Sequence, residues 1–155
     1  MDDLRIPVRR VPVKVAQTDG SQHQLLLFVS ERSPLHEGAE TPSEAISGRR
    51  GFVPALNPAD DSLVCLQVEA IMWMKVNASL ERPGPEADTI PTEHEVEIVL
   101  AGGESCVGLL TYVRPEKHRL SDFLNEGDAP LRLLQGDDML IVNRRHVLRV
   151  VCRRT

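Results

Sequence analysis

Aromatic residues are scarce in this sequence. Phe, Trp and Tyr together make up 3% of its 155 residues, with one Trp and one Tyr. Proteins that bind single-stranded nucleic acids usually stack the bases on aromatic side chains, so this scarcity argues against that class. It also implies that a hydrophobic core is built mainly from Val, Leu, Ile and Met.

Long hydrophobic runs are absent as well. No segment approaches the roughly 20 apolar residues of a membrane-spanning helix. The N-terminal sequence MDDLRIPVRR has acidic residues and no apolar stretch, which argues against a secretory signal peptide. Three widely spaced cysteines, Cys65, Cys106 and Cys152, each lie within an apolar run. We therefore expect a cytoplasmic protein without membrane association, whose cysteines are reduced and buried.

Motifs for catalysis and for cofactor or metal binding are also missing. None of the five histidines is spaced from another His or from a Cys as metal ligands are. Neither a phosphate-binding Gly-x-x-x-x-Gly-Lys-Ser/Thr loop nor a Gly-x-Ser-x-Gly nucleophile motif occurs. Glu93, Glu95 and Glu97 share one face of a predicted strand, which a solvated surface explains better than acid–base chemistry. We predict no enzyme activity, no cofactor and no metal.

The charge of the chain is negative overall but unevenly distributed. The net charge of −5 disfavours bulk attraction to nucleic acid or to an anionic membrane. Basic residues nevertheless gather near the C-terminus, where Arg144, Arg145 and Arg149 lie with no acid between them. Either these arginines contact phosphates or bases, or their aliphatic stems cover the apolar surface of an edge strand. We favour the second interpretation.

What the sequence does contain is a pattern that occurs twice. Alternating strand patterns at 13–15 and 96–98 lie 83 residues apart, and an Asp-Gly or Gly-Gly turn dipeptide follows each. Second strands are predicted at 24–30 and 107–114. The repetition indicates that one small β unit has been duplicated.

The pattern continues through a loop with a short polar motif. Residues 43–47 and 121–125 each begin with a Ser and an acid, which suits the first turn of a helix with the Ser as N-cap. We expect one or two helical turns that plug the mouth of a barrel, with an ordinary surface turn as the alternative. Further matching strands are predicted at 52–56 and 130–134.

The last matching segments, 62–76 and 138–152, lie 76 residues apart. Between the copies, residues 77–93 contain three prolines and no apolar periodicity, as in a linker. We predict a mainly β protein of two tandem, five-stranded small β-barrels at 1–76 and 94–155, each with a short helical turn in a long loop. Residues 71–76 and 147–152 are the candidate edge strands.

Two segments of the second copy carry a family resemblance. The sequence GGESCVGLLTYV at 102–113 has a glycine turn followed by a strand that contains Gly108-Leu109-Leu110. The sequence MLIVNRRHVLRV at 139–150 has a polar turn, Asn143-Arg144, between two apolar strands. Together they resemble the two motifs of the Sm-like superfamily, which includes the Sm, LSm and Hfq proteins. The stretch RLSDFLN at 119–125 is similar to one found in bacterial members of poorly characterised function. The resemblance is faint in the first copy.

The resemblance implies small SH3-like barrels that pair their open edges with neighbours. We therefore expect a homo-oligomer, either a dimer or a ring-like trimer. The leading hypothesis is a non-catalytic oligomeric scaffold or protein-interaction module of a bacterial cytoplasmic assembly, with a further protein partner of unknown identity. The expected interface residues are Trp73, Met74, Val147, Val150, Asp122 and Phe123.

The alternative hypothesis is binding of RNA or of single-stranded nucleic acid. The candidate contacts are Asn143, Arg144, Arg145 and Arg149. This hypothesis predicts an affinity that falls steeply with salt, because phosphate contacts release counterions.

Overall fold

A computed structural model describes residues 8–33, 38–47, 51–81, 92–112, 120–127 and 129–152. Within these residues the protein is mainly β, as the sequence predicts. The first half of the chain contributes the strands β1 (Val8–Gln17), β2 (Gln22–Ser30), β3 (Phe52–Asn57), β4 (Ser62–Gln67) and β5 (Ile71–Asn77). The second half contributes β6 (Thr92–Leu100), β7 (Ser105–Tyr112), β8 (Leu131–Gln135), β9 (Asp138–Val142) and β10 (Val147–Cys152).

Short helical segments connect some of these strands. Helix α1 (Pro42–Ile46) lies between β2 and β3, and α2 (Leu120–Asn125) lies between β7 and β8. Among the described residues, the 3₁₀ turn η2 (Val68–Ala70) precedes β5 and η3 (Ala78–Glu81) follows it. A further 3₁₀ turn, η4 (Arg144–His146), precedes β10.

Helix α1 begins with a capping box. The Thr41 hydroxyl accepts a hydrogen bond from the backbone N–H of Glu44, and the Glu44 carboxylate accepts one from the N–H of Thr41. Pro42 occupies the first turn, where its missing N–H costs nothing. The expectation that Ser43 caps this helix is wrong, because Thr41 precedes it with the required extended backbone and Ser43 lies inside the first turn.

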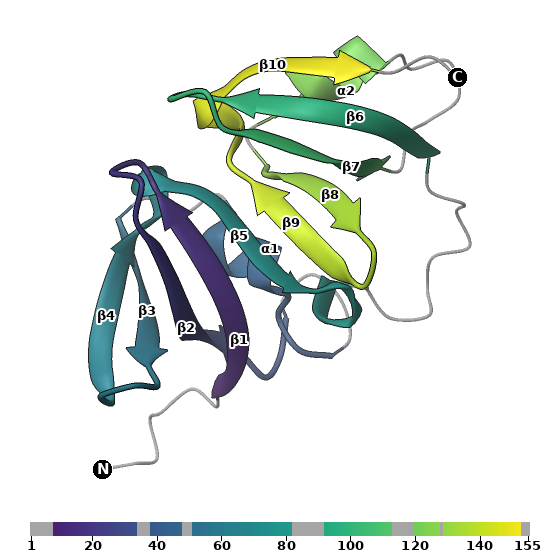
Figure 1. Ribbon diagram of the computed structural model, residues 1–155. Coiled ribbons are helices and arrows are strands. Elements are labelled where there is room, and N and C mark those ends of the chain that lie inside the picture. The colour runs from purple at the N-terminus through teal and green to yellow at the C-terminus, as the bar shows by residue number, and fades with distance from the viewer. Residues whose placement is uncertain are drawn as a thin grey trace.

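All ten strands of the described residues form one open antiparallel sheet. The order is β10-β6-β7-β8-β9-β5-β1-β2-β3-β4, so β10 and β4 are its edges. Figure 1 shows β5 and β9 side by side where the two halves meet. The prediction that 71–76 is an edge strand is therefore wrong, because β9 of the same chain pairs with β5. The prediction for 147–152 agrees with the edge position of β10.

The second half repeats the strand pairing of the first half in register. In the first half, Val15 of β1 pairs with His23 of β2 and with Met74 of β5. In the second half, Ile98 of β6 pairs with Cys106 of β7 and with Val150 of β10. These positions lie 83 or 76 residues apart, which are the spacings of the sequence repeat. The paired strand residues of one half therefore have equivalents in the other.

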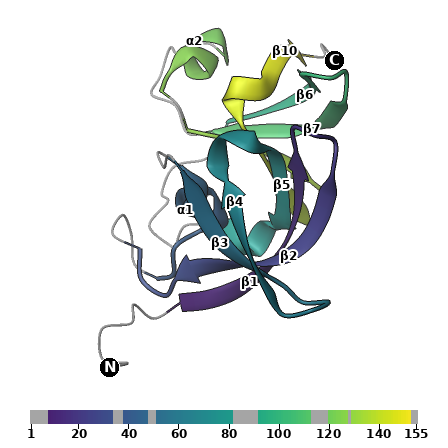
Figure 2. The same ribbon diagram turned by 90° about the vertical axis from the view of Figure 1, so that its left-hand side faces the viewer.

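Two clusters of buried side chains stabilise the sheet. Strands β1 to β5 curve around a shared interior (Figure 2), which the first cluster fills. The second cluster lies among β5 to β10 and α2, with Ala16 of β1. Strand β9 contributes to both, since Met139 and Ile141 face the first cluster and Leu140 and Val142 face the second. This explains why the β9 sequence is apolar at successive positions rather than alternating.

A glycine in β7 is required by the close approach of β8. A Cβ atom on Gly108 would lie 2.6 Å from the backbone oxygen of Leu134 and 2.9 Å from Cγ of Leu133. We expect Gly108→Ala to lower the free energy of unfolding by about 1–3 kcal/mol, because the backbone oxygen must move. Urea denaturation measures this, with Ser105→Ala at an exposed position of the same strand as the control. Equal midpoints for the two variants would contradict the prediction.

Candidate functional site

The junction between the two halves is built on β5 and β9. Trp73 pairs with Val142 and Met74 pairs with Ile141 across these strands. The Trp73 side chain is 6% exposed, and its indole N–H donates to the Glu104 carboxylate over 3.1 Å. Trp73 and Met74, which the sequence places at an interface between copies, thus lie at an interface within one chain.

The turn before β10 ties the same junction from the second half. The Asn143 side-chain amide donates to the backbone oxygen of Ile71, and the Asn143 N–H donates to that of Met72, both over 3.0 Å. The guanidinium of Arg145 lies 3.0 Å from the Glu69 carboxylate in an exposed ion pair. Two candidate nucleic-acid contacts, Asn143 and Arg145, therefore contact the first half of their own chain.

Arg144 holds the C-terminal end of α2. Its guanidinium donates to the backbone oxygens of Phe123, Leu124 and Ala129 over distances of 2.5 to 3.0 Å. Its Cζ also lies 5.0 Å from the centre of the Phe123 ring, as in a cation–π contact. Helix α2 is only six residues long, and these contacts attach it to η4. Arg149, by contrast, is exposed on β10.

A stack of rings continues from Phe123 into the sheet. The Phe123 ring lies 4.1 Å from that of Tyr112, which stacks in turn on His94 at 5.8 Å. His94 Nε2 lies 3.1 Å from the Tyr112 hydroxyl, and its Nδ1 lies 4.0 Å from the thiol of Cys152. Phe123 therefore anchors α2 to β7, whereas Asp122 beside it is exposed.

The two free edges of the sheet carry exposed apolar side chains. Leu63 on β4 is 64% exposed and Leu148 on β10 is 61% exposed. Val147 and Val150, the predicted interface residues of β10, instead pack against the second cluster. The sequence VLRVVC is apolar on both faces of the strand, which is the signal that could have identified Leu148.

Equivalent positions differ sharply in burial. Leu63 is the equivalent of Met139, and Leu148 is the equivalent of Met72. Both methionines are 6% exposed because the two halves cover them at the junction. The free edge of β4 therefore resembles β9 without its partner, and the free edge of β10 resembles β5 without its partner.

No family model, curated protein or solved structure matches this chain. Among the described residues, no group of three or more His, Cys, Asp or Glu side chains is placed to hold a metal ion. No helix of the same segments is long and apolar enough to cross a membrane. What can be inferred about function therefore comes from the junction and the edges themselves.

The cysteines divide between the core and the edges. Cys106 is buried, and burial raises the pKa of its thiol to about 11, with a further contribution from the charge of Glu104. Its thiol is therefore protonated at neutral pH. Cys65 and Cys152 are exposed, so the prediction that all three are buried is wrong for these two. Each lies on an edge strand, where one side has no neighbouring strand among the residues that the structure describes.

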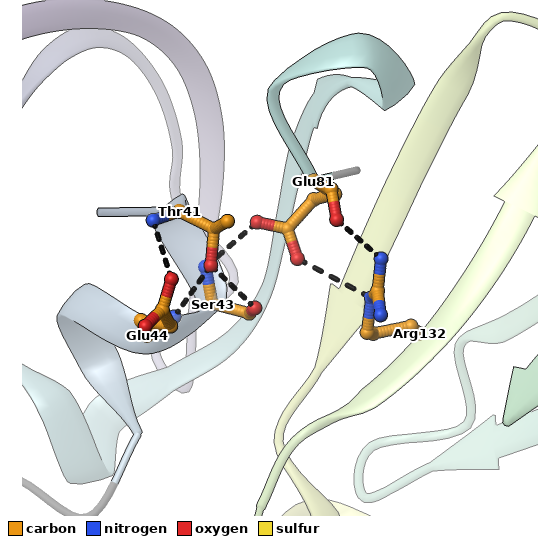
Figure 3. A network of polar contacts seen from close by, with 5 residues as sticks. All are labelled: Thr41, Ser43, Glu44, Glu81 and Arg132. Carbon is orange, nitrogen blue, oxygen red and sulfur yellow. Dashed lines mark hydrogen bonds and ion pairs between the residues drawn. The ribbon is translucent and has the colours of Figure 1, made fainter. Parts of the chain in front are cut away.

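A partly buried polar network crosses the junction beside η3 (Figure 3). The Glu81 carboxylate accepts a hydrogen bond from the N–H of Ser43 in α1 over 2.9 Å. Its other oxygen lies 3.3 Å from Nε of Arg132 in β8. The Arg132 guanidinium also donates to the backbone oxygen of Glu81 over 2.6 Å. Glu81 thus joins α1 and η3 of the first half to β8 of the second half.

The ionisation of Glu81 is shifted by this environment. The Glu81 side chain has no exposed surface, and burial raises the pKa of its carboxyl. Hydrogen bonding to Ser43 and the positive charge of Arg132 oppose that increase. Neither Glu81 nor Arg132 was predicted as a site residue. An acidic residue after a strand and an arginine within a strand are common, so neither residue stands out in the sequence.

Proposed function

We propose that this chain is a non-catalytic scaffold that assembles when β10 of one copy pairs with β4 of the next. The observation that carries the proposal is the β5–β9 pairing inside each chain. Strands β5 and β10 are equivalent, and so are β9 and β4. The junction therefore provides a template for the contact between copies.

The proposal includes the description of the halves as two small Sm-like barrels. The same strand order in both halves supports that description, as do two hydrophobic clusters, one drawn mainly from each half. The resemblance of 102–113 and 139–150 to the Sm-like motifs adds to it. An assembly in the bacterial cytoplasm, with a further protein partner, belongs to the same proposal.

The template specifies a register between copies. Because Val76 pairs with Met139 in the junction, Cys152 of one copy would lie opposite Leu63 of the next. Because Met74 pairs with Ile141, Val150 would lie opposite Cys65. This pairing would satisfy the backbone groups of both edges and cover Leu63 and Leu148.

The two edges of one chain are different, so the contact is heterologous. Such contacts form closed rings when the rotation between copies closes, and a dimer or a ring-like trimer is the expected result. The alternative, nucleic-acid binding, has less support. Of its four candidate contacts, Asn143, Arg144 and Arg145 already bind groups of their own chain.

Charged substitutions at the edges test the proposal. We expect the wild type to form a defined oligomer, and Leu63→Lys or Leu148→Lys to reduce it to the monomer, because a buried ammonium without a partner is costly. Light scattering after size exclusion measures the mass. Val107→Lys is the control, since Val107 is 42% exposed on β7, away from both edges. A wild type that stays monomeric at high micromolar concentration would contradict the proposal.

A cysteine crosslink tests the register. In the Leu63→Cys variant, mild oxidation should link the new thiol to the native Cys152 of another copy, because directly opposed strand residues lie within disulfide range. Val64→Cys is the control because its side chain faces the other side of β4. Equal crosslinking of both variants would exclude this register.

A further inference from the structure

Strand β5 has two possible partners in solution. Strand β9 of its own chain pairs with it, but β4 is the equivalent of β9 and is a free edge on every other copy. Docked on β5 in the same register, β4 would offer Leu63 in place of Met139 and Cys65 in place of Ile141. Backbone hydrogen bonds and apolar contacts would then be similar in the two arrangements. Something else must distinguish the correct partner.

The Glu81–Arg132 pair differs between the two arrangements. Arg132 lies on β8 opposite Ile141 of β9, and its equivalent on β3 is Pro54, opposite Cys65 of β4. When β9 is docked, Arg132 reaches the Glu81 carboxylate. When β4 of another copy is docked, Pro54 of that copy takes the place of Arg132. Glu81 then has no cation beside it. The N–H of Ser43 would still donate to Glu81, but an ionised carboxylate buried without a cation is disfavoured.

We infer that the Glu81–Arg132 pair selects the strand that β5 accepts, admitting β9 of the same chain and rejecting β4 of another copy. The inference rests on the proposed function only in treating β4 as an edge on which another strand can dock. The pair acts by penalising the wrong partner, which is how interfaces often gain specificity.

The geometry of the pair suits selection better than stabilisation. Oε1 of Glu81 and Nε of Arg132 are both buried, and neither makes a well-aligned hydrogen bond, although they lie 3.3 Å apart. A buried ion pair with incomplete hydrogen bonding barely offsets the cost of desolvating its charges. An apolar pair of similar size would hold the junction about equally well, so the pair's distinct effect is on which strands can meet.

A crosslinking experiment between two chains tests the inference. One chain carries Val76→Cys on β5 and the other carries Leu63→Cys on β4, and both carry Cys65→Ser and Cys152→Ser. The two chains are unfolded together, refolded at high micromolar concentration and oxidised. A disulfide between them forms only when β4 docks on β5, because Val76 otherwise lies opposite Met139. With Glu81 and Arg132 intact, we expect little crosslinking.

Removal of the pair should admit the wrong strand. When the chain with Val76→Cys also carries Glu81→Gln and Arg132→Met, we expect the crosslinked fraction to rise about tenfold. Glu69→Gln with Arg145→Met is the matched control, because it removes an ion pair from the same junction whose side chains are 43% and 59% exposed. This control should leave crosslinking unchanged, as exposed pairs contribute little.

A second arm separates selection from a general weakening of the junction. Here the chain with Val76→Cys keeps Glu81 and carries Arg132→Met, and the chain with Leu63→Cys either keeps Pro54 or carries Pro54→Arg. Glu81 then finds a cation only on the other chain, so Pro54→Arg should raise the crosslinked fraction. If either arm fails to show its increase, with folded proteins by circular dichroism, the inference is overturned. Because β10 takes no part, a failure of the proposed β4–β10 assembly would be visible separately by light scattering.

Discussion

Arg132→Met is expected to lower the free energy of unfolding by about 3–5 kcal/mol at neutral pH, because it leaves a buried charge uncompensated. The Glu81 side chain has no exposed surface and cannot reach water without local opening. The opposite substitution, Glu81→Gln, should cost less, because the Arg132 side chain keeps 34% of its surface exposed and can be hydrated. Urea denaturation of both variants measures the difference.

The double variant completes this comparison. Glu81→Gln with Arg132→Met removes both charges and should recover most of the loss, to within about 1–2 kcal/mol of the wild type. A double variant as unstable as Arg132→Met alone would mean that packing by the Arg132 stem, rather than the charge on Glu81, is what the single substitution removes.

The pH dependence follows from the raised pKa of Glu81. Because the folded-state pKa lies above the unfolded value of about 4.5, the stability linked to this carboxyl is fully present below that value and is lost as the pH rises through the folded pKa. In Arg132→Met the opposing positive charge is gone, so this pKa should be still higher. The stability lost in that variant should therefore shrink as the pH is lowered from neutrality. Unfolding curves at neutral and mildly acidic pH, with the double variant as control, measure this.

Trp73→Ala is the second substitution with a large expected effect. Trp73 is 6% exposed and belongs to the second hydrophobic cluster although it lies on a strand of the first half. Its removal should lower the free energy of unfolding by about 3–5 kcal/mol, the usual cost of a large cavity. The Glu104 carboxylate would also lose the indole donor. Thermal or urea denaturation measures the change.

The control for Trp73 comes from the repeat itself. Arg149 is the equivalent of Trp73 on β10 and is exposed at the free edge of the sheet. Arg149→Ala in the monomer should change the free energy of unfolding by no more than about 0.5 kcal/mol. If both substitutions had the same effect, the burial of Trp73 at the junction would not be the cause of its contribution.

The strand content and the internal spacing were accessible from the amino-acid pattern. Alternating apolar residues at 13–15 and 96–98, followed by Asp-Gly or Gly-Gly, place the first strand and turn of each half where the structure has β1–β2 and β6–β7. These features depend on neighbouring residues only, so a local pattern carries them. The N-cap of α1 was predicted two residues too late, at Ser43 instead of Thr41. Both residues have side chains suited to an N-cap, and only the extended backbone conformation of Thr41 distinguishes them.

The candidate site was only partly accessible. Trp73 and Met74 were expected at an interface, and they lie at one, but between halves of the same chain. The run IMWMKV is apolar on both faces of β5, which is typical of a strand covered on both sides, and this signal argued against an edge. Glu81 and Arg132 meet across 51 residues of sequence, and no local pattern relates them.

The amino-acid sequence by itself determined that this chain is mainly β, where the first turn of each half lies, and that its second half repeats the first. The tertiary structure alone decided that β5 is central, that β4 and β10 are the free edges, and that Glu81 is buried against Arg132. The physical reason is that side-chain patterns specify which face of a strand is apolar. The backbone edge of a strand has the same donors and acceptors for almost every residue, so the neighbouring strand is selected only when distant segments pack together.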